Sequence, residues 1–212
     1  MNGLVKCSVT LALMTLGMLF LIGLIEISTA NKIEQSLRNH RHTLVKDILR
    51  NMDYEALANV QFAFETPVNL TPSVSLSLIN AIITKGQRSA VLIEMTTNSG
   101  YNGIIKLLVA VRADGVVLGS RVIEHHETPG LGDKIELDRS DWMDSFVDKS
   151  LSNVPTNGWR VLRDGGEFDQ FTGATITPRA VVKAVHLTLL FVRDHHEELF
   201  QVNTGRTEVT SQ

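Results

Sequence analysis

Cysteine is almost absent from this 212-residue chain, in which Cys7 is the single example. One cysteine cannot form a disulfide within the chain, and it cannot supply the cluster of thiolates that holds an iron–sulfur centre. The redox compartment therefore cannot be inferred from cysteine usage. A protein of this composition that carries electrons must use a flavin or another bound cofactor.

An excess of basic charge is also lacking, because 20 Lys and Arg stand against 23 Asp and Glu, a net charge of −3. A basic footprint is typical of nucleic-acid-binding domains, so no nucleic-acid partner is expected. No Gly-x-Gly-x-x-Gly fingerprint follows a strand, so the chain is not expected to bind NAD itself. Paired histidines occur at 125–126 and 195–196, but neighbours on a strand point to opposite faces and the spacing matches no zinc motif. We expect no metal site.

One long uncharged run, residues 7–25, lies near the N-terminus. Its length fits a helix that spans a bilayer. The alternative is a cleaved signal peptide with Ser28-Thr29-Ala30 as the cleavage site, although a signal core is usually shorter, about 7–15 apolar residues. We expect a short N-terminal segment over 1–6 and a membrane anchor over 7–25.

The rest of the chain predicts an α+β domain. Helical spacing of Ile33, Leu37, Leu44 and Ile48 predicts a helix over about 31–57, within a stalk over 26–57. Apolar runs predict strands over 90–95, 104–111 and 116–123, and the turn signals between them, including Asp114-Gly115, indicate a mainly antiparallel sheet. The domain is expected over 58–200, with flanking helices, and a flexible tail over 201–212.

The second half of the domain predicts three more elements. Ser140 would cap a short amphipathic helix with Trp142 and Phe146 on one face. Residues 159–162 would form a short strand. Thr177 and Pro178 would open the last helix as its N-cap and first position. Its apolar stripe is Val181, Val182, Val185, Leu189 and Val192.

A short segment just before that last helix offers threonine hydroxyls beside small residues. Glycine and alanine leave space for a modifying enzyme and for close backbone contact. The alternative is structural, with Thr172, Thr175 and Thr177 merely capping the helix. The segment reads Asp169-Gln170-Phe171-Thr172-Gly173-Ala174-Thr175.

Other blocks precede this segment in a fixed order. They are Gly100-Tyr101-Asn102-Gly103, then Glu124-His125-His126-Glu127-Thr128-Pro129-Gly130-Leu131-Gly132-Asp133-Lys134-Ile135-Glu136, then Asp164-Gly165-Gly166-Glu167-Phe168. In this order the blocks resemble the G subunit of the Rnf/Rsx ion-translocating electron transport complex, an FMN-binding domain family. The related C subunit of the sodium-translocating NADH:quinone reductase shares the threonine motif. The resemblance is close over roughly 100–185 and includes the single membrane segment.

The resemblance implies a covalent cofactor. FMN would be joined to Thr175 by a phosphoester bond, which a flavin transferase makes from FAD, and Asp169, Thr172, Gly173 and Ala174 would belong to the recognised sequence. The helix N-terminus would favour the phosphate.

The glycine-rich loop would line the flavin, with backbone amides approaching its edge and Leu131 packing on its face; an ordinary tight loop is the alternative. The block with Tyr101 would help hold the ribityl phosphate or pack beside the ring, unless it is only a hairpin turn. The loop residues are Glu127, Thr128, Pro129, Gly130, Leu131 and Gly132.

The implied function is that of one electron-carrying subunit, without turnover alone, among the other membrane subunits of an inner-membrane complex. Such a complex passes electrons between ferredoxin and NAD, couples this to ion translocation, and in some bacteria keeps a redox-sensing transcription factor reduced. The resemblance places residues 1–6 in the cytoplasm and the domain in the periplasm. The basic residues predict the opposite, because Lys6 precedes the anchor whereas Lys32, Arg38 and Arg41 follow it.

Two other functions stay open. The chain could be an assembly subunit whose flavin site has decayed. It could also be a free-standing, membrane-anchored flavin reductase, which would need an acid–base pair that only Glu127 with His125 or His126 could supply.

Overall fold

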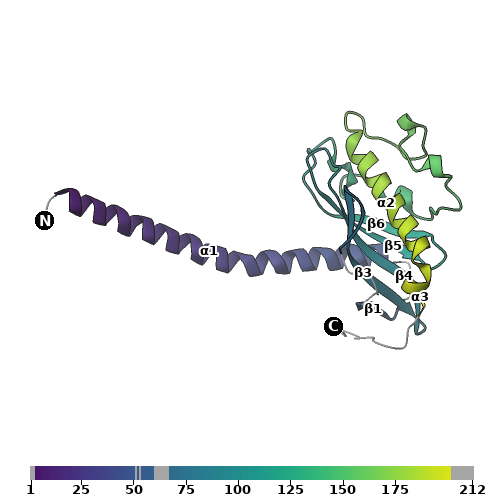
Figure 1. Ribbon diagram of the computed structural model, residues 1–212, viewed down its shortest axis with the longest axis horizontal. Helices are drawn as coiled ribbons and strands as arrows, with labels where there is room; N and C mark the ends of the chain where they lie inside the picture. Colours follow the sequence, from purple (N-terminus) through teal and green to yellow (C-terminus); the bar gives the residue numbers. More distant parts are fainter. Residues whose placement is uncertain (1–2, 51, 53, 60–66, 202–212) are drawn as a thin grey trace. The chain divides into compact units, whose positions relative to one another are not determined.

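The computed structural model describes residues 3–50, 52, 54–59 and 67–201 (Figure 1). Contacts within the chain divide it into two units that meet between Thr43 and Leu44. The first unit is the greater part of helix α1, Gly3–Ile48. The second unit is a domain built on one antiparallel sheet.

The first part of α1 is long and apolar enough to cross a membrane. Its most apolar window, Cys7–Leu24, has a mean hydropathy of 2.2, and none of it is buried within the structure. The hydroxyls of Thr10 and Thr15 donate to the carbonyls of Cys7 and Ala12, at 2.9 Å each. These bonds satisfy the polar groups of the helix locally, as an apolar environment requires.

The predicted helix over 31–57 is wrong at its C-terminal end. α1 runs without a break from the apolar window to Ile48 and is followed by a turn. Strand β1, Ala56–Asn59, comes next and pairs with Asn80 to Ile83. The helical spacing of Leu44 and Ile48 ends with α1. The backbone groups of β1 form hydrogen bonds within the sheet and not within a helix.

The sheet has the order β1-β3-β4-β5-β6, with β2 also on β3, and every pairing is antiparallel. The three predicted strands are confirmed as β4, β5 and β6, and so is the antiparallel α+β fold. The Asp114-Gly115 turn is also confirmed, since the Arg112 amide donates to the Val116 carbonyl at 2.9 Å and Gly115 has φ 82°. The prediction missed β1, β2 and the long β3, whose start alternates apolar and polar residues. The remaining bounds are β2 Val68–Thr71, β3 Val74–Thr84, β4 Gln87–Thr97, β5 Ile105–Arg112 and β6 Val117–His125.

Both faces of the sheet are buried, which explains the nearly continuous apolar runs in β4 and β5. Helix α2, Ile176–Asp194, lies over β4 and β5 on one face, where it packs with Ile93, Leu107 and Val109 (Figure 1). Alternate residues of the same strands face the other way. There Leu92, Leu108 and Ala110 form a second core with Val45, Ile48 and Leu49. The predicted stripe of α2 is buried throughout, as expected.

Arg121 joins the end of α1 to the domain with a buried charge. Its guanidinium lies 2.6 Å from Asp47 of α1 and 2.7 Å from Asp144, and it also donates to the Ser120 carbonyl at 2.7 Å. The side chain is only 9% exposed. A charge so well removed from water requires such partners.

The connection between β6 and α2 consists of loops and single-turn 3-10 helices: η1 Asp133–Ile135, η2 Trp142–Phe146, η3 Thr156–Gly158 and η4 Leu162–Asp164; a short α3, His196–Phe200, follows α2. A short helix after Ser140 is confirmed as η2, but its N-cap is Asp141 and not Ser140 as predicted. The Ser140 hydroxyl, one residue earlier, accepts the Trp142 amide at 3.1 Å. The predicted strand over 159–162 is wrong, because only a single bridge joins Val161 to Phe168. Trp159 is buried by stacking on His186 and by a tilted ring contact with Phe168 rather than by a sheet.

The predicted start of the last helix is also wrong, by two residues. Thr175 is the N-cap and Ile176 the first residue of α2, so Thr177 and Pro178 lie inside the first turn. Proline is tolerated there because the first amides of a helix have no partner within it.

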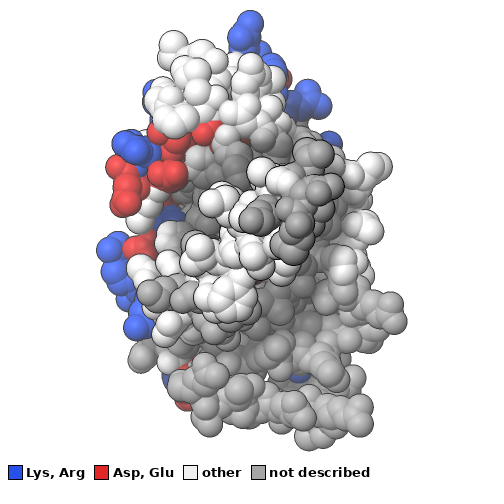
Figure 2. Space-filling model, turned by 90° about the vertical axis from the view of Figure 1, so that its left-hand side faces the viewer, with Lys and Arg blue, Asp and Glu red and all other residues white. Residues whose placement is uncertain are grey.

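Charged side chains are interspersed on the surface. On the face drawn in Figure 2, the described acidic and basic side chains alternate along one edge instead of gathering in a patch of one sign.

Replacing Arg121 tests the junction between α1 and the domain. Arg121→Ala leaves Asp47 and Asp144 without their cation, and we expect a loss of about 2–3 kcal/mol in the free energy of unfolding, below the range for a fully buried pair because Asp144 is half exposed. Both tryptophans lie in the domain, so their fluorescence during urea unfolding in detergent measures this change. Arg193→Ala, which removes an exposed pair, is the control and should change stability by less than about 1 kcal/mol. If Arg121→Ala and Arg193→Ala were equally stable, the Arg121 network would contribute nothing to the free energy of unfolding.

Candidate functional site

A cavity of about 560 Å³ lies where three segments distant in sequence meet. They are the β4–β5 loop, the loop after β6 and the first turn of α2. Sites for small molecules and cofactors commonly have this size. Its lining consists of Tyr101, Glu127, Thr128, Leu131, Gly132, Gly173, Ala174, Thr175, Ile176, Thr177 and Arg179.

Most of the residues that the sequence singled out lie in this lining. Asp169, Thr172, Pro129 and Gly130 are outside it, and all four are exposed. The lining residues that the sequence analysis missed are Ile176, Thr177 and Arg179. Arg179 follows Thr175 by four residues, a spacing that places both on one side of a helix and could have indicated it.

Thr175 stands at the N-cap of α2, half-buried in the cavity wall. Its hydroxyl makes no capping hydrogen bond. Thr172 is exposed, and Thr177 lies inside the helix, so none of the three threonines caps α2 through its side chain. The free amides of Ile176 and Thr177 favour an anion at this point.

The loop that carries Thr175 is held from behind. Trp142 donates its indole N–H to the Asp169 carbonyl at 2.9 Å, and its ring meets Phe171 edge-on at 5.1 Å. Gly173 has φ 83°, a conformation that favours glycine, and a side chain there would approach Leu131 within 3.3 Å. These contacts fix the backbone of the loop while its side chains face the solvent and the cavity.

Glu127 is the buried charge of the cavity, with an exposed fraction of 5%. Its Oε1 accepts the backbone amide of Asn102 at 3.1 Å, and its Oε2 accepts the hydroxyl of Thr177. A Cβ at Gly100 would lie 2.7 Å from Oε1, and one at Gly132 would lie 2.8 Å from Oε2. The group that the Gly132 backbone approaches closely is therefore this carboxylate. The carboxylate links all three segments of the cavity.

Arg179 brings a positive charge to the cavity and pairs with Asp164 through two bonds of 2.5 and 2.6 Å. These hydrogen bonds hold the pKa of Asp164 below its ordinary value and raise the pKa of Arg179. The pair therefore stays charged at neutral pH.

The histidines near the cavity have other partners. His125 Nδ1 accepts the backbone amide of Glu127 at 3.0 Å, so the ring proton lies on Nε2, which donates to Glu136 at 2.7 Å. His126 is exposed. Within the described part of the chain, no hydrogen bond joins either ring to the Glu127 carboxylate.

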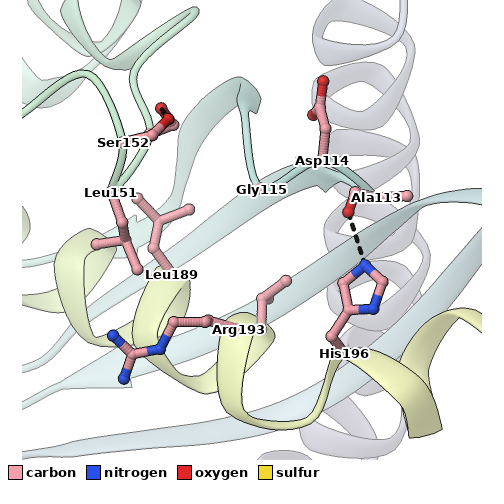
Figure 3. A pocket seen from close by; sticks show the side chains of 10 residues that line it. Ala113, Asp114, Gly115, Leu151, Ser152, Leu189, Arg193 and His196 are labelled. Atoms are coloured by element: carbon pink, nitrogen blue, oxygen red, sulfur yellow. Dashed lines mark hydrogen bonds between the residues drawn. The ribbon is translucent and has the colours of Figure 1, made fainter.

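A second, smaller cavity of about 350 Å³ lies at the other end of α2 (Figure 3). Its charged and imidazole side chains have partners: His196 bonds to the Ala113 carbonyl at 2.8 Å, and Asp114 and Arg193 pair with Arg112 and Asp194 outside the lining. The larger cavity is therefore the candidate site.

Known proteins identify this part of the chain. The FMN-binding domain family matches residues 100–189, which include every residue that lines the larger cavity. The G subunit of the ion-translocating oxidoreductase complex from Vibrio vulnificus is 39% identical over 201 residues, 94% of each chain. Its counterpart from Vibrio atlanticus is 37% identical over 201 residues, 94% of this chain and 95% of its own. The counterpart from Aliivibrio fischeri is 53% identical over 114 residues, 54% of each chain.

The resemblance drawn from the sequence motifs is thus confirmed. The chain belongs to the family of the G subunits of ion-translocating oxidoreductase complexes and contains their FMN-binding domain.

Proposed function

We propose that this chain is the electron-carrying G subunit of a membrane-bound electron transport complex and holds FMN through a phosphoester bond to Thr175. The observation that carries the proposal is the place of Thr175, at the N-terminus of α2 in the wall of a cofactor-sized cavity, with no capping bond to its hydroxyl. The FMN-binding domain and the names of the relatives support the same interpretation.

The residues present fit a flavin nucleotide. At one end, Thr175, the first amides of α2 and Arg179 offer an attachment point, hydrogen-bond donors and a positive charge for a phosphate. Apolar side chains stand exposed around the rest of the lining, with Tyr101 66%, Leu131 42% and Ile176 45% exposed, and a flat ring would cover them. Bound FMN would supply the electron-accepting and electron-donating chemistry.

Attachment requires a second enzyme. A flavin transferase would move the FMN moiety of FAD to the Thr175 oxygen, breaking the pyrophosphate bond, releasing AMP and leaving a phosphodiester with one negative charge. Asp169 and Thr172 lie outside the cavity and are exposed, which suits residues that the transferase reads. Trp142 would hold the loop ready by fixing the Asp169 carbonyl.

The covalent bond suits the proposed location, in which α1 anchors the chain once in the bacterial inner membrane and the domain faces the periplasm. A weakly held cofactor would be lost there by dilution. The other membrane subunits would pass electrons between ferredoxin and NAD, couple the transfer to ion translocation, and in some bacteria keep a redox-sensing transcription factor reduced. Cleavage of the first segment as a signal peptide is the alternative to an anchor.

Two other functions have less support. A free-standing flavin reductase needs an acid–base pair, whereas His125 is engaged by Glu136 and a backbone amide. An assembly subunit with a decayed site would have no reason to keep the cavity, its glycines and the Thr175 motif together.

The attachment point is tested by intact mass and in-gel flavin fluorescence of protein co-produced with a flavin transferase. Thr175→Ala should lose the FMN adduct completely, because no oxygen remains to form the ester. Thr175→Ser keeps the hydroxyl and should keep the adduct. An adduct that persists on Thr175→Ala, or is absent from the wild type despite an active transferase, would refute the linkage.

Orientation is tested by cysteine labelling. Cys7→Ser removes the single native thiol, and Ser145→Cys adds one at an exposed position of η2. A membrane-impermeant maleimide should label this variant in intact spheroplasts if the domain is periplasmic. Labelling only after the membrane is permeabilised would show that the basic residues after the anchor predict the orientation correctly.

A further inference from the structure

The carboxylate of Glu127 is an unusual group to find in the wall of an electron-transfer site. It is buried, and it lines the cavity. Both of its oxygens accept hydrogen bonds, from the Asn102 amide and the Thr177 hydroxyl, which is the arrangement that suits an ionised carboxylate, since it can only accept. Both donors are neutral groups.

Within the described part of the chain, no cation pairs with this charge at close range. Among the described residues, the ion pairs of 4.0 Å or less do not include Glu127. Arg179 lines the same cavity, but it is held in two bonds to Asp164. The wall near Glu127 therefore carries a net negative charge away from bulk water, where charges interact more strongly than at the surface.

The position of the charge is also fixed. Gly100 and Gly132 approach its two oxygens so closely that a Cβ at either position would collide with them. The two hydrogen bonds come from two other segments of the cavity. The carboxylate cannot turn out to the solvent without displacing those segments. Any group that fills the cavity lies against it.

We propose that Glu127 lowers the reduction potential of the flavin in this cavity. Reduction brings electrons, and hence negative charge, into a space that already holds a fixed negative charge, and this disfavours the reduced form. The inference rests on the proposed function, and it adds a role for the carboxylate beyond lining the site.

Glu127→Gln removes the negative charge and keeps the shape of the side chain. The Gln oxygen can accept the Asn102 amide, and its NH₂ group can donate to the Thr177 hydroxyl, which only has to rotate. Both hydrogen bonds are kept while the charge is lost. We expect the midpoint potential of the covalently loaded, full-length protein in detergent to shift to more positive values in a spectroelectrochemical titration.

Glu136→Gln is the matched control. It removes the same charge from a half-exposed residue near the cavity but outside its lining, so its shift should be clearly smaller. The Glu127→Gln shift should also persist at high salt, because buried charges are screened less than exposed ones. Intact mass measures FMN loading in each variant, and tryptophan fluorescence measures folding.

An unchanged potential in loaded Glu127→Gln, or a shift equal to that of Glu136→Gln, overturns the inference and leaves the proposed function intact. A wild type without FMN overturns the proposed function itself. Should Glu127→Gln fail to load, Thr177→Val is the second variant: it removes a donor whose dipole partly offsets the negative charge of the carboxylate, so the potential should shift to more negative values. An unchanged or more positive potential there overturns the inference.

Discussion

The hydrogen bonds of Glu127 are the interactions on which the cavity depends, because they join the β4–β5 loop and the first turn of α2 to the loop after β6. Asn102 is 25 residues before Glu127, and Thr177 is 50 residues after it. A buried charge with no partner is strongly destabilising, so the β4–β5 loop and the first turn of α2 must both approach the carboxylate. Gly100 and Gly132 permit that approach, since larger residues would collide with its oxygens. The walls of the cavity are thus held together by the chain's own contacts.

This arrangement explains the unexpected start of α2. A threonine before a proline would ordinarily cap a helix, yet the Thr177 hydroxyl is buried and turned to Glu127. The helix begins two residues earlier, which places Thr175 at the N-cap with its hydroxyl unused for capping. Arg179 then stands one turn further on in the same cavity. One buried hydrogen bond therefore positions the proposed attachment point.

The sheet supports this site and also packs against the last residues of α1. Its strands are apolar on both faces, one packed on α2 and the other on the last residues of α1. Gly119 has no side chain where Ile48 packs, and Arg121 holds Asp47 of the helix. The helix that includes the candidate membrane span is therefore part of the core of the redox domain at its C-terminal end.

The sequence by itself determined those features that depend on neighbouring residues. Local periodicity predicted β4, β5, β6 and the apolar stripe of α2, and an uncharged run predicted the candidate span. The order of the short motifs predicted the family and most of the residues that line the cavity. Only the tertiary structure decided where α1 ends, that β3 pairs with β1, β2 and β4, that Thr177 donates to Glu127 instead of capping α2, and that Arg179 lines the site. The physical reason is that each of these outcomes is set by a partner distant in the chain, such as the strand that pairs with β1 or the carboxylate 50 residues before Thr177. Local propensity is overridden at these points because a hydrogen bond to a buried polar group, or the pairing of a strand edge, stabilises the fold more than the preferred cap or helical turn would.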